Sequence, residues 1–598
     1  MKKLAKVLSL ALVLVMVLSL GGTAWAAETH IVTINKDPTD TATHTYEAYQ
    51  IFAGTYDAGN STLMNITWGT GVDSSKLVDA LKTEFSSNET ASTVVKTPAT
   101  GSNSAVYYTV GELFDAANSA AKCAEAISEL NANHDDATAQ KIAAIVGANL
   151  SSTISGTGSN TGVSGLADGY YLIKDKDDSL NGKEGAYTRY ILEVVNNVEV
   201  QEKASVPSVV KKVQDVNDTD GILTGYQDSA DYDIGDAVPF QITATTASTV
   251  SDYTKYHVTI QDKQSDGLNA PERFTITVLD KTFYMKNDGK FYTDNTFKTE
   301  DSSGNTATTE NGTIITVSKA TLETDQTFAI KVEFKNSTIG SKINVEANNK
   351  PIVVEYKSVL NTRAKIGSEG NPNEVYMKYS NNPNAEDDKE GKTPTDKVIV
   401  FTYKTVIDKV DKNGVALNGA DFTLYKEVPS AVDSATKGSD LTFDDGVEHS
   451  AIDANKHYVT VGNKTGNATG ATFTFNGIDD GTYVLVETTV PEGYNPWKSA
   501  VVTVAATHDT DSADPKLTAL TATAPFSTTN LEGGTVTKKD GSTHTCVSGE
   551  AYAEIINQQG NVLPTTGGVG TTLFYVFGSI LVIAAAVYFV TKKRSEVE

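Results

Sequence analysis

Apolar and polar side chains alternate over many short segments of the chain, and this period of two predicts β-strands. Residues 237–242 (AVPFQI) and 328–334 (FAIKVEF) are clear cases, because an apolar residue recurs at every second position. A half-buried strand has this pattern, since successive side chains point to opposite faces of a sheet. Tyr, Thr and Val, which favour strands, are plentiful. We therefore expect a mainly β protein built of tandem immunoglobulin-like sandwiches.

A different period occurs in the first part of the chain. Alanine and leucine recur at helical spacing in residues 75–85 and 110–150, between strand-like segments at 31–34 and 46–52. A loop rich in Gly, Ser and Thr at residues 151–165 leads back to strands. The first domain is therefore predicted to be a β domain with helical insertions.

The chain has 598 residues, which is enough for several domains that each bury a core. Changes in composition and strand patterning divide it into five parts. These are a signal peptide (1–26), an N-terminal domain (27–203), a middle β-sandwich (204–397), a C-terminal β domain (398–561) and a tail (563–598).

The N-terminus has the three features of a secretory signal. Lys2, Lys3 and Lys6 precede an apolar run at residues 7–20, and the small residues of Ala24-Trp25-Ala26 follow. The run is shorter than the roughly 20 residues that a spanning helix needs. We expect cleavage near Ala26 and export of the chain.

The C-terminal tail combines a short motif, an apolar run and a basic end. Residues Leu573 to Val590 are nearly all apolar, and Lys592-Lys593-Arg594 follow them. This pattern predicts a transmembrane span with a cytoplasmic basic end. Just before the span stands the pentapeptide Leu563, Pro564, Thr565, Thr566 and Gly567.

Charge and residue usage exclude several kinds of function. The formal net charge of -26 and the lack of a basic patch argue against nucleic acid as a partner. The two cysteines, Cys123 and Cys546, are too few for a disulfide framework. The eight histidines are scattered and no GxSxG motif occurs, so we predict no metal site, no cofactor and no enzyme acting on an external substrate.

The order of pentapeptide, apolar span and basic end resembles the cell-wall sorting signal of Gram-positive surface proteins. The resemblance implies that a sortase cysteine cleaves between Thr566 and Gly567 and holds Thr566 as an acyl-enzyme until an amine attacks. The chain would then be secreted and anchored to the cell wall.

The C-terminal domain carries motifs that resemble the collagen-adhesin B-type domains of fimbrial pilins. They are Lys409-Val410-Asp411, residues 419–425 (GADFTLY), residues 481–488 (GTYVLVET) and residues 554–557 (EIIN). The resemblance implies an isopeptide bond between Lys409 and Asn557, with Glu487 as the promoting acid. In a core, an unpaired lysine tends to lose its proton and a carboxyl tends to keep one. The alternative is an ordinary salt bridge or a solvated set of side chains.

The middle domain resembles the corresponding domain of the same pilins and contains a second candidate trio. Lys211, Asp262 and Asn381 each fall on the apolar face of a predicted strand, which favours a Lys211–Asn381 bond with Asp262 as the acid. Lys212 and Asn382 are the neighbouring alternatives for the bonded pair. If no bond forms, these residues would be an ordinary set of solvated polar side chains. In the first domain, Asp175 with Lys36 and Asn196 form a fainter version of the same pattern.

Lys203 lies between the first two domains, where pilins of this family carry the lysine that accepts the next subunit. The surrounding segment differs from the usual motif, because Gln201-Glu202 stands in place of Tyr-Pro. The resemblance implies a major structural subunit of a fimbria, joined from Thr566 to Lys203. Its partners would be sortase, other copies of itself, minor tip or base pilins and host surface ligands. The alternative is a monomeric wall-anchored adhesin, in which Lys203 is never acylated.

Overall fold

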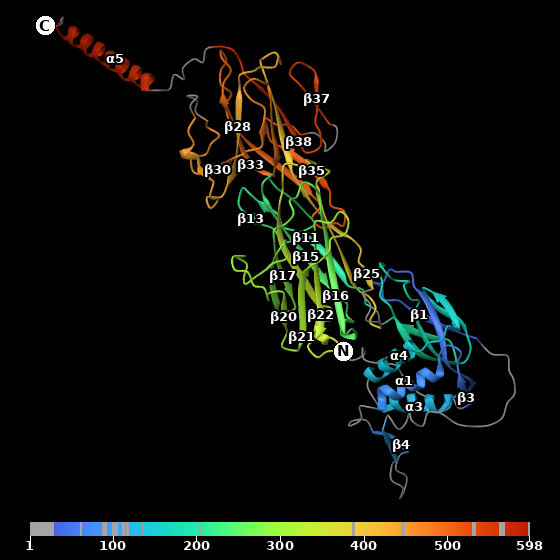
Figure 1. Ribbon diagram of the computed structural model, residues 1–598. Helices are drawn as coiled ribbons and strands as arrows, with labels where there is room; N and C mark the ends of the chain where they lie inside the picture. The colour runs from blue at the N-terminus through green and yellow to red at the C-terminus, as the bar shows by residue number, and fades with distance from the viewer. Residues whose placement is uncertain are drawn as a thin grey trace.

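The structure is a computed structural model in which three β-rich units follow one another along the chain, with a separate C-terminal helix (Figure 1). The prediction of a mainly β chain with helices in its first domain is confirmed. The structure describes residues 29–59, 62–86, 93–97, 106–109, 114, 119–133, 136–202, 205–384, 389–443, 449–528, 534–560 and 569–595.

The first unit is an eight-stranded sheet with helices on one face. The strand order is β10-β1-β7-β6-β2-β8-β9, with β3 paired to β2. Leu77 and Leu81 from α1 and Ile142 and Val146 from α4 pack with Phe52 of β2, which is the apolar contact expected of amphipathic helices. The elements are β1 (His30–Asn35), β2 (Thr45–Asp57), β3 (Thr62–Trp68), α1 (Ser74–Ser86), β4 (Thr93–Thr97), β5 (Val106–Thr109), α3 (Ala120–Asn133), α4 (Asp136–Ala148), β6 (Gly156–Ser159), β7 (Gly162–Leu166), β8 (Gly169–Asp175), β9 (Arg189–Val194) and β10 (Val198–Gln201).

The middle unit is a sandwich of a six-stranded and an eight-stranded sheet. The alternating segment 237–242 lies in β15, whose Val238, Phe240 and Ile242 are fully buried in the core between the sheets. β26 crosses the predicted boundary at residue 397, because it pairs with β14 and β24 of this unit. The main strands are β11 (Ser208–Val213), β14 (Ser229–Asp231), β15 (Ala237–Thr245), β16 (Lys255–Gln264), β17 (Arg273–Val278), β18 (Lys281–Lys286), β19 (Phe291–Tyr292), β20 (Thr306–Thr308), β21 (Thr313–Lys319), β22 (Phe328–Asn336), β23 (Pro351–Val359), β24 (Asn371–Ser380), β25 (Glu390–Lys392) and β26 (Asp396–Phe401), with a small hairpin of β12 (Val216–Asn217) and β13 (Ile222–Leu223).

The third unit packs a four-stranded sheet, β31-β32-β27-β38, against a six-stranded sheet, β29-β30-β28-β33-β34-β35. Its first long strand, β27, runs parallel to its last, β38, and Lys409 stands opposite Ile555. The elements are β27 (Tyr403–Val410), β28 (Asp421–Val428), β29 (Thr436–Lys437), β30 (His457–Thr460), β31 (Lys464–Thr465), β32 (Thr472–Ile478), β33 (Gly481–Thr489), β34 (Ala500–His508), β35 (Leu517–Ala522), β36 (Thr535–Thr537), β37 (Thr543–Thr545) and β38 (Glu550–Ile556).

The junction between the middle and third units is strongly charged. Lys426 of β28 is only 1% exposed, and its ammonium lies 2.6 Å from Asp218, 2.8 Å from Asp233 and 3.5 Å from Asp479. Two of these carboxylates belong to the middle unit, so the lysine ties the two units together. Nearby, Asp236 is a further carboxyl of the same cluster.

The C-terminal helix α5 (Val569–Ser595) covers the apolar run that we predicted to be a transmembrane span. When the described residues alone are counted, no helix has a long enough apolar stretch to cross a membrane. The predicted signal peptide (1–26) lies outside the described residues.

Candidate functional site

Lys409, Glu487 and Asn557 meet in the core of the third unit. β27 supplies Lys409, β33 of the facing sheet supplies Glu487, and Asn557 directly follows β38. Each of the three is at most 1% exposed. The alternation of side chains along a strand accounts for the position of Glu487, since Tyr483, Leu485 and Glu487 share the buried face of β33.

The three side chains of this site contact one another directly. The Lys409 Nζ lies 2.5 Å from Asn557 Oδ1 and 3.3 Å from Glu487 Oε1. The Asn557 amide donates to both Glu487 oxygens, at 2.9 and 3.2 Å. The backbone N–H of Trp497 also donates to Glu487 Oε2, at 2.6 Å. The amine, the amide and the acid are therefore held within hydrogen-bond distance.

The environment of Lys409 favours its neutral form. Burial lowers the pKa of Lys409 to about 8, although the negative charge of Glu487 opposes the shift. Phe422 lies beneath the ammonium, with the ring centroid 5.8 Å from Nζ. At pH 7 about a tenth of this amine is then neutral, far more than for an exposed lysine, and the neutral amine is the nucleophile.

The middle unit contains a second buried site around Lys211 of β11 and Asp262 of β16. Both are fully buried, and the Lys211 ammonium contacts both the Asp262 carboxylate and the side-chain oxygen of Asn373. Tyr356 connects the set, because its hydroxyl donates to Asp262 Oδ2 and accepts from Asn373 Nδ2, each at 3.0 Å. Burial lowers the pKa of Lys211 and raises the pKa of Asp262, which favours the neutral pair.

The asparagine of this second site is Asn373, so the prediction of Asn381 was wrong. Asn373 and Asn381 are both odd-numbered, and alternation alone gives them the same face of β24. They are eight residues apart, which is about 26 Å along a strand. Asn381 instead faces the first unit, where its amide donates to the carbonyls of Leu180 at 3.1 Å and Gly185 at 3.3 Å.

The neighbouring alternatives in the middle unit do not reach the core. Lys212 points toward the surface and pairs with Asp228 at 2.5 Å. Asn382 accepts a hydrogen bond from the backbone N–H of Asn384 at 3.0 Å, and so stabilises a turn. Neither contacts Asp262.

The structure does not bring together the trio considered for the first unit. Asp175 is buried, but it hydrogen-bonds His44 at 2.7 Å and the backbone N–H of Thr188 at 2.7 Å. Asn196 is exposed, and the ammonium of Lys36 donates to the carbonyl of Ala42. This site contains a buried histidine, His44, which the sites around Lys409 and Lys211 lack.

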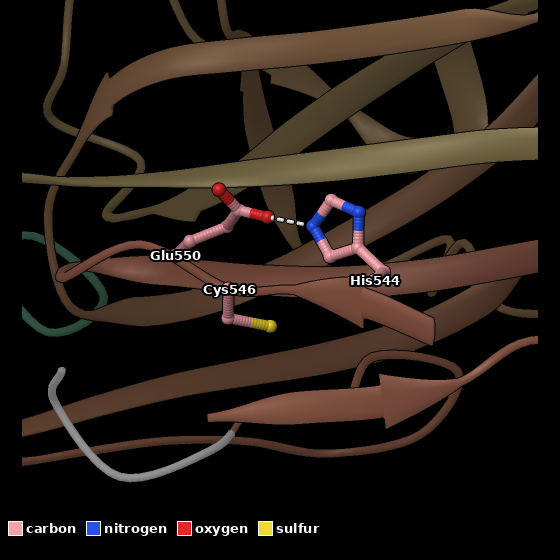
Figure 2. Close-up of side chains that lie close together, drawn as sticks. All are labelled: His544, Cys546 and Glu550. Atoms are coloured by element: carbon pink, nitrogen blue, oxygen red, sulfur yellow. Dashed lines mark hydrogen bonds and ion pairs between the residues drawn. The ribbon is translucent and has the colours of Figure 1, made fainter. Parts of the chain in front are cut away.

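A further polar cluster in the third unit contains His544, Cys546 and Glu550 (Figure 2). His544 Nε2 lies 2.5 Å from Glu550 Oε1, and Lys404 lies 3.0 Å from Glu550 Oε2. The imidazole also stacks on Tyr552, with ring centroids 3.8 Å apart. The His544 imidazole and the Lys404 ammonium thus contact one oxygen each of Glu550, and these contacts account for the arrangement.

Two predicted sites lie outside the described residues. They are Lys203 and the pentapeptide of Leu563, Pro564, Thr565, Thr566 and Gly567. The residue before Lys203, Glu202, is described, and its side chain is buried in the first unit.

Two known families match parts of the chain. Residues 403–517 match SpaA, a prealbumin-like fold domain, and this range holds Lys409 and Glu487. Residues 555–597 match the LPXTG cell wall anchor motif, which contains the predicted sorting pentapeptide. The chain therefore carries a prealbumin-like domain followed by a cell wall anchor.

Comparison with whole proteins finds a streptococcal surface protein and, among solved structures, several pilins. The chain is 27% identical over 289 residues to the trypsin-resistant surface T6 protein of Streptococcus pyogenes, which covers 40% of this chain and 48% of that protein. It thus spans about half the length of this curated relative. Among solved structures, the T6 backbone pilin of S. pyogenes matches with 15% identity and a TM-score of 0.43, over 90% of this chain and 100% of the other. The major pilin SpaD of Corynebacterium diphtheriae matches with 13% identity and a TM-score of 0.39, over 90% and 98%.

Proposed function

We propose that this chain is the backbone subunit of a covalently polymerised surface fimbria, with two internal isopeptide bonds. The observation that carries the proposal is the buried contact of Lys409, Glu487 and Asn557 inside a prealbumin-like domain that precedes an LPXTG anchor. A protein of this kind is structural, and its only chemistry is performed once on itself.

The proposed reaction in the third unit joins the two side chains. The neutral Nζ of Lys409 attacks Cγ of Asn557, while Glu487, which accepts hydrogen bonds from the Asn557 amide nitrogen, is placed to relay a proton to that nitrogen. A bond forms between Nζ and Cγ while the bond between Cγ and Nδ2 breaks. Glu487 takes a proton from Nζ and delivers one to Nδ2, so that ammonia leaves and the carboxyl is regenerated. The 3.3 Å distance between Nζ and Oε1 supports this proton transfer.

We assign the second bond to Lys211 and Asn373, with Asp262 as the acid. The buried contacts of the Lys211 ammonium with Asp262 and Asn373 support it. Tyr356 orients Asp262 and Asn373 through its hydroxyl. The same atoms form and break bonds as in the third unit, with ammonia again the leaving group.

For assembly, the proposal is that a sortase cleaves between Thr566 and Gly567 and transfers Thr566 to Lys203 of another copy. In this scheme the apolar tail around α5 holds the precursor at the membrane until cleavage. Lys203 follows β10, at the junction of the first two units, where an enzyme reaches the chain more readily than within a sheet. Minor tip or base pilins and host surface ligands are the further partners that this role requires.

The test of polymerisation is an immunoblot of surface extract boiled in denaturant. We expect the native chain to give a high-mass ladder, and Lys203→Ala to give monomer. Lys176→Ala, another lysine of the first domain, is the matched control and should keep the ladder. A ladder that persists in Lys203→Ala would move the acceptor to another lysine, whereas monomer from the native chain would favour the wall-anchored adhesin.

A further inference from the structure

A buried histidine in the first unit lies among three carboxylates. His44 directly precedes β2, Asp40 lies in the loop after β1, Asp175 ends β8, and Glu202 follows β10. The side chains of these four residues are all 0% exposed. Three separate segments of the chain, one of which holds both Asp40 and His44, therefore converge on one enclosed polar site.

One ring nitrogen of His44 is fixed by a hydrogen bond. Nδ1 lies 2.7 Å from Asp175 Oδ1, and Asp175 Oδ2 in turn accepts from the backbone and the hydroxyl of Thr188, at 2.7 and 3.1 Å. Because Asp175 is a fixed acceptor, Nδ1 carries the proton. In the neutral imidazole the lone pair then resides on Nε2, as it does in histidines that bind a metal and are oriented by a carboxylate.

The other ring nitrogen faces two carboxylate oxygens. His44 Nε2 lies 3.2 Å from Asp40 Oδ2 and 3.7 Å from Glu202 Oε1, and the three atoms lie within 4.8 Å of one another. Neither His44 Nε2 nor Glu202 Oε1 has a hydrogen-bond partner among the described residues. Tyr46, whose ring stacks on His44 with centroids 5.4 Å apart, has a buried hydroxyl that also lacks one. Buried polar atoms without partners are costly, so a ligand is expected here.

The separations of His44 Nε2 from the Asp40 and Glu202 oxygens are close to those between neighbouring ligands of a tetrahedral metal ion. Zinc binds imidazole nitrogen and carboxylate oxygen at about 2.0–2.2 Å, which places neighbouring ligand atoms about 3.3–3.5 Å apart. The two measured separations lie on either side of this range. A divalent ion also suits the charge of the cluster, which holds three carboxylates. The other cation beside it is Lys36, whose ammonium lies 3.8 Å from Asp40.

We propose that His44, Asp40 and Glu202 bind a divalent transition-metal ion of the zinc class, with Asp175 orienting the imidazole. The prediction from the sequence that the chain has no metal site is revised by this inference, because the ligands come from distant segments. Glu202 directly precedes Lys203, so the bound ion would fasten the chain to the first unit on one side of that lysine. The importance of this position for assembly rests on the proposed function, but the metal site does not.

The competing state is a proton in place of the metal. Burial lowers the pKa of His44, but the hydrogen bond that its Nδ1 donates to Asp175 and the nearby charge of Asp40 outweigh burial and raise this pKa to about 9. A protonated His44 would form ion pairs with Asp40 and Glu202 and would leave no site for a cation. The two states differ in whether Nε2 binds hydrogen or metal, which can be measured directly.

The experiment uses the full chain, purified in detergent without a histidine tag, stripped with a chelator and then given Zn²⁺. After desalting, elemental analysis should find about one Zn²⁺ per chain. Glu202→Gln and Asp40→Asn should bind Zn²⁺ at least about 100-fold more weakly, because each loses a ligand charge. The control Glu550→Gln, which alters the cluster of His544 and Cys546, should bind like the native chain.

Native chain that retains no Zn²⁺, or Glu202→Gln that retains as much as the native chain, would overturn the proposal. If circular dichroism shows that the variants fail to fold, NMR spectra of the native chain labelled with ¹⁵N-histidine decide whether the site holds a metal ion or a proton. Added Zn²⁺ should shift one buried Nε2 resonance to the range of a metal-bound imidazole, and an unchanged spectrum would assign the site to a proton. Polymerisation is measured separately by immunoblot. A chain that binds no metal can therefore be told apart from a chain that does not polymerise.

Discussion

Lys409 Nζ and Asn557 Oδ1 lie 2.5 Å apart although 148 positions separate the two residues in the chain. The contact exists because the first and last long strands of the third unit are parallel neighbours. A bond at this point would close almost the whole unit into one ring.

Formation of this bond should be visible as a loss of mass. Each crosslink releases one ammonia, so the native chain should be about 34 Da lighter than its sequence predicts if both bonds form. Glu487→Ala should lose only about 17 Da, since the acid of the third unit is missing. Intact-mass spectrometry of the purified chain is the measurement, and a Glu487→Ala mass equal to that expected for two crosslinks would exclude a role for the acid.

The crosslink should also stabilise the third unit. Closing a ring of this size removes entropy from the unfolded chain worth about 5 kcal/mol. We expect Lys409→Ala to lower the melting temperature of this unit by about 10 °C or more in calorimetry. Lys404→Ala, a lysine of the same strand outside the trio, is the control, and an equal loss in both variants would contradict the ring-closure explanation.

The assignment of Asn373 in the middle unit has a matched control in Asn381. Both are fully buried asparagines, one within β24 and one directly after it, but only Asn373 contacts Lys211. Asn373→Ala should abolish the middle crosslink, while Asn381→Ala should keep it and weaken only the contact with the first unit. Tandem mass spectrometry of the Lys211 peptide distinguishes the two results, and a peptide joined to Asn381 would restore the original prediction.

Lys426 should be essential to the junction between the middle and third units. Lys426→Met leaves the carboxylates of Asp218, Asp233 and Asp479 without their cation, and removing one member of a buried ion pair costs about 3 kcal/mol or more. The control is Lys464→Met, which breaks a partly exposed pair with Asp421 and should cost less than about 1 kcal/mol. Urea unfolding of both variants tests this, and similar losses would show that the junction does not depend on Lys426.

The same junction should become less stable as pH rises. Burial and the neighbouring Asp233 and Asp218 raise the pKa of Asp236 to about 7, so the folded chain holds a proton there that the unfolded chain releases near pH 4. The contribution of Asp236 to stability is therefore present below about pH 4 and is lost as pH rises to about 7. Asp236→Asn should be more stable than the native chain at pH 8 by roughly 1–2 kcal/mol and should show a weaker pH dependence. Urea unfolding at pH 5 and pH 8 provides the comparison; a native chain that is more stable at pH 8 would refute the assignment.

Strand alternation predicted which residues face the cores, but it did not predict how strands align. It placed Lys211 and Asp262 correctly in the core, because the side-chain period of a strand is local information. Asn373 and Asn381 have the same parity, and only the pairing of β24 with β16, in which Gln264 stands opposite Asn373, decides between them. The cluster around His44 was missed for a related reason, since its four members come from segments whose meeting depends on the topology of the first sheet.

The parallel pairing of β27 and β38 has a mechanical consequence. If Lys409 and Asn557 are bonded, a pulling force that enters the unit near its start leaves near its end through that bond, and the strands between carry none of it. The bypassed segment would otherwise extend to about 500 Å when pulled straight. A filament of such units would resist stretching by covalent bonds, and its hydrogen-bonded sheets would be spared the load.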